Sequence, residues 1–212
     1  MEPKFMISEV FGTSWKHTKS QIWVLVGLFI GFSILSMIVT LFGMPAQGSI
    51  VGRVIVQIVS LLISCIFMLG YVKNIFQALD GEEPQFSAYG QQSRKIITYL
   101  IANILFSIAV CIGMVLLIIP GIYLYLRLQF FTAFIVEEDC GIIKSLQKSW
   151  NMTQGQTLPL FLLLLTMIGT AIVGCILFFV GFFVAVPLIY MMQCYTFRKL
   201  NTISTEEEVQ QL

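Results

Sequence analysis

The sequence predicts an all-α integral membrane protein with six transmembrane helices arranged as three hairpins. Two observations on composition predict this class. Of the 212 residues, 58% are hydrophobic and only 11% are charged, with a mean hydropathy of +0.90, whereas a soluble domain carries about 25% charged residues. The third observation is that uncharged apolar runs of membrane-spanning length recur along the chain. Together they exclude a soluble globular protein and a disordered one.

Six spans follow from the lengths of these runs, because a helix needs about 20 apolar residues to cross a bilayer. The expected spans cover residues 22–43, 50–77, 96–119, 121–137, 158–180 and 182–198, within one polytopic domain of residues 1–212. The third span is expected to stop at Pro120-Gly121, with Pro120 opening the fourth. The last two are obtained by cutting one uncharged run near Gly181, because that run is too long for a single crossing.

Basic residues give the orientation, because they collect on the cytoplasmic side of a membrane protein. Ten of the twelve are expected on one side of the six-span arrangement: Lys4, Lys16, Lys19, Lys73, Arg94, Lys95, Lys144, Lys148, Arg198 and Lys199. All eleven acids lie on that side too. Both termini are therefore expected in the cytoplasm, and only Arg53 and Arg127 are not explained by this rule.

Amphipathic interfacial helices are expected before spans 1 and 5, with Trp15 and Trp150 as anchors in the headgroup layer. Apolar residues recur there every three or four positions, with lysines on the other face. The two segments also align at a shift of 135 residues, which pairs Ser14, Trp15, Thr18 and Gln21 with Ser149, Trp150, Thr153 and Gln156. This parallel repeat predicts a third copy before span 3, of which Phe86 and Tyr89 are the visible trace.

Arg127 is the most informative candidate residue, since an ionisable side chain within a span is a functional hypothesis by default. It lies seven residues past Pro120, about 10 Å along the helix. In the structural interpretation it snorkels outward or binds backbone carbonyls, stacked over Tyr123. In the functional interpretation it binds an anionic group such as a lipid phosphate. Arg53 enters span 2 from the same outer side, so a joint anion site with Arg127 is a further hypothesis.

Glu137, Glu138 and Asp139 form an acidic cluster where span 4 leaves the membrane. Three interpretations stay open: a solvated face, a divalent-cation site, or ion pairs with basic neighbours such as Lys144 or Lys148. The acids also favour the start of the following helix through its dipole. Metal-ligand spacing is otherwise missing, because the chain has one histidine and its five cysteines form no CxxC pair. We therefore expect no metal and no cofactor.

Small residues permit close helix packing in two spans: Gly27 with Gly31 in the first, and Gly169 with Gly174 in the fifth. Contacts within the chain are favoured over dimerisation here. The sequence does not predict the oligomeric state.

The segment from Pro120 to Gly155 resembles a signature of small six-span bacterial membrane proteins of unassigned activity. The residues that carry it are PGIYLYLR at 120–127, EED at 137–139, SLQKSW at 145–150, Thr153 and Gly155. The loop Gly81-Glu82-Glu83-Pro84 is similar to that family as well. The family is related to the membrane domain that precedes some glycerophosphodiester phosphodiesterases. The resemblance implies a bacterial inner membrane and supplies no activity, since the catalytic barrel of those enzymes is absent here.

The function that these observations favour is non-catalytic: an inner-membrane protein that organises or binds anionic lipid, or assists other membrane components. Nucleophilic triads, phosphate loops and nucleic-acid patches have no candidates, so no enzymatic activity and no nucleic acid partner are expected. The expected partners are membrane lipids and a cytoplasmic or intramembrane protein. The alternative is a small transporter or channel subunit for an anionic or lipid-like solute.

Overall fold

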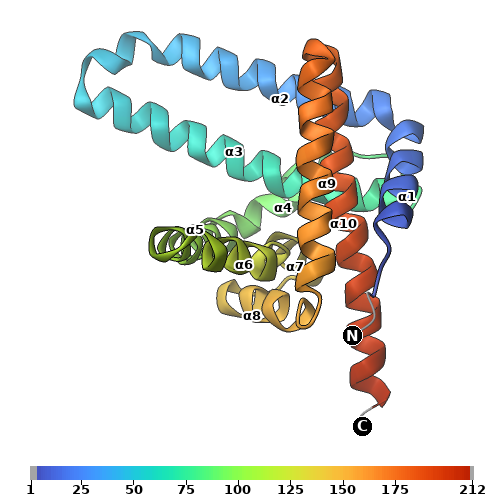
Figure 1. The fold of residues 1–212 in the computed structure, drawn as a ribbon. Coiled ribbons are helices and arrows are strands. Elements are labelled where there is room, and N and C mark those ends of the chain that lie inside the picture. The colour runs from blue at the N-terminus through green and yellow to red at the C-terminus, as the bar shows by residue number, and fades with distance from the viewer. Residues whose placement is uncertain (1–3, 211–212) are drawn as a thin grey trace.

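The computed structural model describes residues 4–210, and this part of the chain is helical apart from short connections (Figure 1). The α-helices are α1 (Ile7–Ser20), α2 (Ile22–Gly43), α3 (Ile50–Leu79), α4 (Ser87–Gln92), α5 (Ile96–Leu116), α6 (Ile118–Leu128), α7 (Phe131–Glu138), α8 (Ile142–Met152), α9 (Thr157–Ile176) and α10 (Phe178–Gln210). Two short 3-10 helices, η1 (Pro45–Gly48) and η2 (Ser93–Lys95), join α2 to α3 and α4 to α5. The predicted all-α class is confirmed.

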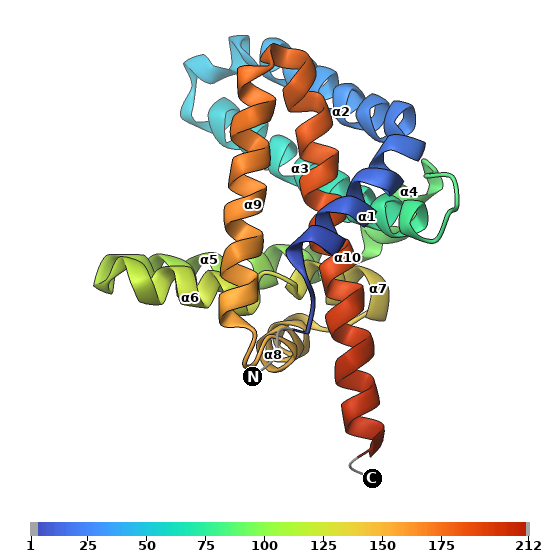
Figure 2. The ribbon, with the colours of Figure 1, turned by 45° about the vertical axis from the view of Figure 1, so that its right-hand side comes forward.

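The long helices pack as three pairs of chain neighbours: α2 with α3, α5 with α6, and α9 with α10. We call the turn that joins a pair its tip and the opposite end its base. The pairs diverge from one another, since α9/α10 stands upright in Figures 1 and 2 while α5/α6 runs almost at right angles to it. The bases of the pairs meet where Phe76, Phe134 and Phe197 lie against one another. The molecule is therefore held together at one end.

Close approach of glycines closes the tip of the α5/α6 pair. A Cβ atom on Gly121 would lie 2.5 Å from Met114 Cγ and 2.7 Å from the Met114 backbone nitrogen. A Cβ on Gly113 would lie 2.8 Å from Gly121 Cα. Only glycine allows the two backbones to pack this closely. The positions of Gly113 and Gly121 therefore determine where the chain can turn.

The predicted boundary between spans 3 and 4 is wrong by a few residues. Leu117 is the extended residue between the helices, and α6 already begins at Ile118. Pro120 therefore lies inside the first turn of α6. A proline is tolerated there because the first backbone N–H groups of a helix have no acceptor within it.

The boundary between spans 5 and 6 is displaced in the same direction. The chain turns at Leu177 and α10 begins at Phe178, so Gly181 lies in the first turn of α10 rather than in the connection. Its hydrogen-only side chain lets it approach α9, because a Cβ there would lie 2.6 Å from the carbonyl oxygen of Gly174. The helix then continues well beyond the predicted end of span 6.

The fourth span, predicted as one helix over residues 121–137, is broken. It consists of α6 and α7, separated by Gln129 and by Phe130 with φ −93° and ψ 3°. The break persists because side chains from other helices bond the backbone groups that it frees, as described below.

The three helix pairs form three equivalent units, each opened by a shorter helix: α1, α4 and α8. The helices predicted before spans 1 and 5 are present as α1 and α8, and α4 supplies the third copy. Equivalent positions in the first helix of each pair are buried: Leu25, Tyr99 and Leu160, then Leu28, Ala102 and Leu163. α4 packs on α3, α8 packs on α6 and α7, and α1 packs on α10. Each opening helix thus covers the second helix of another unit, and the three units close into a ring.

The hydrophobic core lies at the base of the pairs, not along their length. One phenylalanine from each unit meets there: Phe76 of α3, Phe134 of α7 and Phe197 of α10, all at most 2% exposed. The ring centroids of Phe134 and Phe197 are 4.8 Å apart, and those of Phe76 and Phe197 are 5.7 Å apart. Burial of aromatic area thus joins the units where their second helices converge.

Five helices in the described part of the chain are long and apolar enough to cross a membrane. They are Ile22–Gly43, Ile50–Leu79, Ser87–Leu116, Ile118–Glu138 and Thr157–Ile176, where α4 with α5, and α6 with α7, each count as one continuous stretch. The sixth predicted span, residues 182–198, lies within α10. The count of six crossings and their arrangement as three membrane hairpins stay predictions.

Candidate functional site

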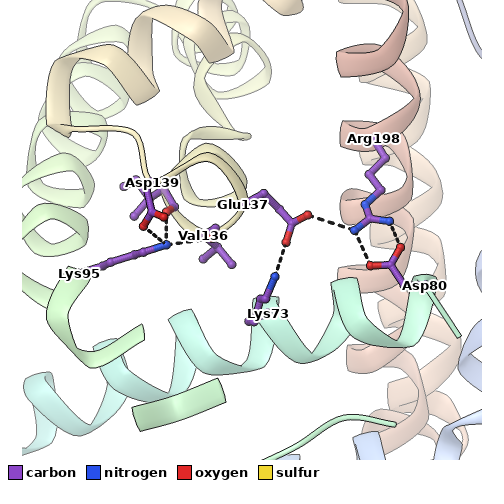
Figure 3. A network of polar contacts seen from close by, with 8 residues as sticks. Lys73, Asp80, Lys95, Val136, Glu137, Asp139 and Arg198 are labelled. Carbon is purple, nitrogen blue, oxygen red and sulfur yellow. Dashed lines mark hydrogen bonds and ion pairs between the residues drawn. The ribbon is translucent and has the colours of Figure 1, made fainter. Parts of the chain in front are cut away.

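Glu137, at the end of α7, lies between basic side chains of the other two units (Figure 3). Its Oε1 accepts a hydrogen bond from Lys73 Nζ of α3 at 3.0 Å, and its Oε2 accepts one from Arg198 Nη2 of α10 at 3.0 Å. Arg198 also forms a two-bond ion pair with Asp80, which follows α3. The side chain of Glu137 is 18% exposed, so solvent screens these contacts only in part. One carboxylate therefore links all three units.

The two acids that follow Glu137 have basic partners as well. Glu138 pairs with Lys148 of α8 at 2.5 Å and accepts a hydrogen bond from Asn201 at 2.9 Å. Asp139 pairs with Lys95 at 2.5 Å. Of the interpretations open for this cluster, the structure thus favours ion pairing, and Lys148 is one of the two partners that the sequence proposed. Residues 4–210 contain no group of three side chains arranged to hold a metal ion.

Lys95 is a buried lysine that the sequence analysis did not single out as a site residue. Its Nζ donates to the backbone oxygens of Ile135 at 2.9 Å and Val136 at 3.0 Å, besides Asp139 (Figure 3). These carbonyls belong to the last turn of α7, where no backbone N–H is available within the helix. Lys95 therefore caps α7 from another segment. The sequence shows only that Lys95 lies directly before span 3. The expected orientation in the membrane explains a lysine there equally well, so its position did not indicate a cap.

The pKa values of two of the acids respond to this pairing. The hydrogen bond from Arg198 holds the pKa of Asp80 below its ordinary value, against a smaller opposing effect of burial. The hydrogen bond from Lys95 does the same for the pKa of Asp139. Both carboxyl groups are therefore ionised in the folded protein at neutral pH.

Arg127 lies in the last turn of α6 and is 3% exposed. Its Cζ lies 4.3 Å from the ring centroid of Trp150 in α8 and 5.8 Å from that of Tyr123, one turn earlier. The two rings meet edge to face, at 87° and 5.9 Å. The structure thus brings together three residues that the sequence analysis proposed, two for a site and one as an anchor. Trp150 is half-buried because its ring covers the guanidinium.

The backbone at the break between α6 and α7 is bonded by side chains of other helices. The carbonyl oxygen of Arg127 accepts hydrogen bonds from Ser149 Oγ at 2.9 Å and Thr153 Oγ1 at 3.1 Å, both at the end of α8. The backbone nitrogen of Phe130 donates to Ser149 Oγ at 3.2 Å. Gln193 of α10 donates to the carbonyl oxygen of Gln129 at 3.1 Å. The repeat residues Ser149 and Thr153 thus hold the broken helix.

Arg53 does not join this site. It lies exposed in the first turn of α3, next to the tip of the α2/α3 pair, whereas Arg127 lies in the last turn of α6 against α8. The two arginines therefore belong to opposite ends of different pairs. Trp15 of α1 is 43% exposed. The cation–π contacts found within residues 4–210 involve other rings, Trp150 among them.

A pocket of about 490 Å³ opens between α1 and α10 near the base, lined by His17, Tyr195, Arg198 and Lys199 among others. Its cations already have carboxylate partners, because Lys199 pairs with Glu9 and Arg198 with Asp80. The charges of Arg198 and Lys199 in this pocket are therefore compensated. Arg127 differs from it, since no carboxylate in residues 4–210 pairs with that guanidinium.

Comparison with known proteins gives a family and one curated relative. The family model described as "Domain of unknown function (DUF7847)" matches residues 86–206, from the start of α4 into the last part of α10. The "Uncharacterized protein Rv2560" of Mycobacterium tuberculosis is 26% identical over 132 residues. That alignment covers 62% of this chain and 40% of the relative, so the chain spans less than half of that protein.

Comparison with the solved structures gives no match. The matches that are found carry no mention of a glycerophosphodiester phosphodiesterase, so the relation to the membrane domain of those enzymes stays an expectation of the sequence. Because the family model covers more than half of the chain, including the broken helix, Arg127 and the acidic cluster, this protein belongs to the DUF7847 family.

Proposed function

We propose that this chain is a non-catalytic protein of the bacterial inner membrane, with both termini in the cytoplasm, that binds and organises anionic lipids. Lys16, Lys19 and Lys144 lie exposed on the helices that precede spans 1 and 5, and none of the ion pairs within residues 4–210 engages them. Exposed lysines of this kind attract the anionic headgroups of the inner leaflet, by about 1 kcal/mol for each one near the surface. The bases of the helix pairs, where the ion pairs lie, then face the cytoplasm.

The observation that carries this proposal is how little of most of the apolar helices is covered by protein. Only 11% of the most apolar stretch of α2 is buried, and the figure is 22% for α3 and for α9, whereas it is 56% for the broken helix of residues 118–138. Helices that diverge from a common base leave most of their apolar residues open to the bilayer. A solute pathway needs spans that pack around it, whereas contact with lipid needs spans that separate.

Absence of catalysis is part of the proposal. The acids of the cluster at 137–139 are engaged in ion pairs, and the one histidine of the chain bonds a backbone oxygen, with Nδ1 3.3 Å from Ala78 O. An acid–base catalyst has to be free to exchange protons with a substrate. Assistance to a cytoplasmic or intramembrane protein partner also belongs to the proposal, and the base of the helix pairs is the part of the molecule that such a partner would contact. The relation to the phosphodiesterase membrane domain belongs to this proposal as well.

Lipid analysis of the purified protein tests the proposal. We expect full-length protein extracted in mild detergent to retain phosphatidylglycerol or cardiolipin above their share of the membrane, as measured by native mass spectrometry. Reconstituted vesicles should show no protein-dependent flux of anions. Retention of lipids in the bulk membrane proportions would contradict the proposal.

One observation favours the alternative, a small transporter or channel subunit for an anionic or lipid-like solute. The helix α6/α7 is discontinuous, and broken membrane helices form substrate sites in many transporters. Gln193→Leu removes the amide that bonds the carbonyl oxygen of Gln129 at the break. Protein-dependent anion flux into vesicles that is lost in this variant would favour the alternative over lipid organisation.

A further inference from the structure

We infer that Arg127, Trp150 and Tyr123 form a binding site for the phosphate group of an anionic ligand at the cytoplasmic headgroup level. The inference rests on the orientation in the proposed function and adds the ligand class, the residues and the leaflet. The chemistry shared by the candidate ligands is a phosphate mono- or diester, which either a phospholipid headgroup or a free phosphate supplies.

The guanidinium of Arg127 is the one buried cation of the base that lacks an anionic partner within residues 4–210. Its Nε is buried and has no hydrogen-bond partner in that range. Lys95, which is similarly buried at 8% exposed, shows the contrast, since it bonds two carbonyl oxygens and a carboxylate. The chain therefore supplies hydrogen-bond acceptors to Lys95, whereas the guanidinium of Arg127 is left to a ligand.

The aromatic contacts do not compensate the burial of this charge. A cation–π contact and the helix dipole at the end of α6 each favour the charged form only modestly. Withdrawing a guanidinium from water costs more free energy than these two interactions contribute. An anion that accepts from the guanidinium offsets the remainder. The planar fork of arginine matches two oxygens of one phosphate, which a lysine does not.

The position of Trp150 fixes the level of the site in the membrane. This residue belongs to α8, an amphipathic helix that follows the cytoplasmic acidic cluster and carries exposed Lys144 on its other face. Arg127 stacks beneath Trp150, and so it faces the inner headgroup layer rather than the outer one. Tyr123, whose ring centroid lies 5.8 Å from Arg127 Cζ, is 39% exposed, so this edge of the site is open.

The test compares Arg127→Gln and Arg127→Lys with the wild-type full-length protein. In nanodiscs of phosphatidylcholine with phosphatidylglycerol, we expect Arg127→Gln to lower the selective retention of phosphatidylglycerol by about 10- to 100-fold, the effect of one charge-assisted contact. Arg127→Lys should keep part of it. Arg53→Gln is the matched control, since it removes the other span arginine, and it should bind like wild type. Equal losses in both glutamine variants would show a general charge effect and overturn the site.

Two further measurements make the outcomes decisive. Inorganic phosphate and glycerol 3-phosphate are added to protein in neutral lipid, and stabilisation of wild type but not of Arg127→Gln assigns the site to free phosphates rather than lipids. Trp15→Phe/Trp23→Phe leaves Trp150 as the only tryptophan, so its fluorescence reports binding next to Arg127 even if Arg127→Gln folds poorly. No response of Trp150 to either ligand would leave a purely structural stack and overturn the site. Wild-type lipid selectivity that survives in Arg127→Gln would reject the site but keep the proposed function.

Discussion

Glu137 accepts a hydrogen bond from Lys73 at 3.0 Å, across 64 positions of sequence, and thereby ties α7 to α3 at the base of the molecule. Arg198 bonds the other oxygen of the same carboxylate from α10. These ion pairs and the phenylalanines beside them join the three units at the base.

Loss of the Glu137 carboxylate is expected to loosen all three units. Glu137→Gln should lower the free energy of unfolding by about 1–3 kcal/mol, because Lys73 and Arg198, both partly buried, lose their charged partner. Thermal unfolding in detergent measures the effect. Glu83→Gln, in the exposed loop after α3, is the control and should stay within about 0.5 kcal/mol of wild type. Equal shifts in the two variants would contradict a central role for Glu137.

Removal of the Lys95 ammonium is expected to unfold the end of α7. Lys95→Met keeps most of the aliphatic stem and removes three hydrogen bonds, so we expect a loss of about 1–3 kcal/mol. Amide hydrogen exchange of residues 131–138 should increase at the same time. Lys144→Met changes an exposed lysine of the same charge and should alter neither quantity. Unchanged exchange in Lys95→Met would show that Lys95 is not the cap.

Acid should weaken the base of the molecule through Asp80 and Asp139. The pKa of each lies below its ordinary value of 3.8 in the fold. A group of this kind stabilises the protein above its unfolded pKa, and the stabilisation is lost as pH falls through the folded pKa. The melting temperature is therefore expected to decline below pH about 5 and further below pH about 4. Asp80→Asn/Asp139→Asn should melt lower at pH 7 and respond less to acid.

Bulk at the tip of the α5/α6 pair should not be tolerated, whereas bulk in α2 should be. Gly121→Val introduces atoms where a Cβ already lies 2.5 Å from Met114, so we expect a loss of more than about 2 kcal/mol or a failure to express. Gly27 and Gly31 have nothing within 4 Å of an added Cβ. Gly27→Ala/Gly31→Ala should therefore leave stability unchanged or raise it. The structure corrects the expectation that these two glycines pack within the chain.

The orientation in the membrane stays a prediction that labelling can decide. In a background without cysteine, Gly48→Cys at a tip should react with an impermeant thiol reagent in intact cells. Glu83→Cys, in the loop between α3 and α4, should react only after the cells are opened. The reverse pattern would invert the topology.

Local patterns in the sequence predicted most of the helices, and long-range contacts decided the rest. The first span was predicted at the residues where α2 begins and ends, because the run is strongly apolar and contains no charged residue. The fourth was mistaken for one helix, because the break at Gln129 depends on hydroxyl and amide groups supplied by α8 and α10. The repeat of Ser149 and Thr153 was visible, but its purpose depends on what they touch.

The sequence by itself determined the class of the protein, since hydropathy and the sidedness of charge act through composition and order alone. It also determined that the chain is repeated. Only the tertiary structure decided which charges are compensated. Glu137, Glu138 and Asp139 look like a free acidic surface in the sequence, yet each has a basic partner from elsewhere in the chain, which for Glu137 and Glu138 belongs to another unit. Arg127 was predicted inside the fourth span, and the break in that span places it in the last turn of α6, against Trp150 of α8. Charge compensation depends on distances of a few ångströms between residues far apart in the chain, and only the packed base fixes those distances.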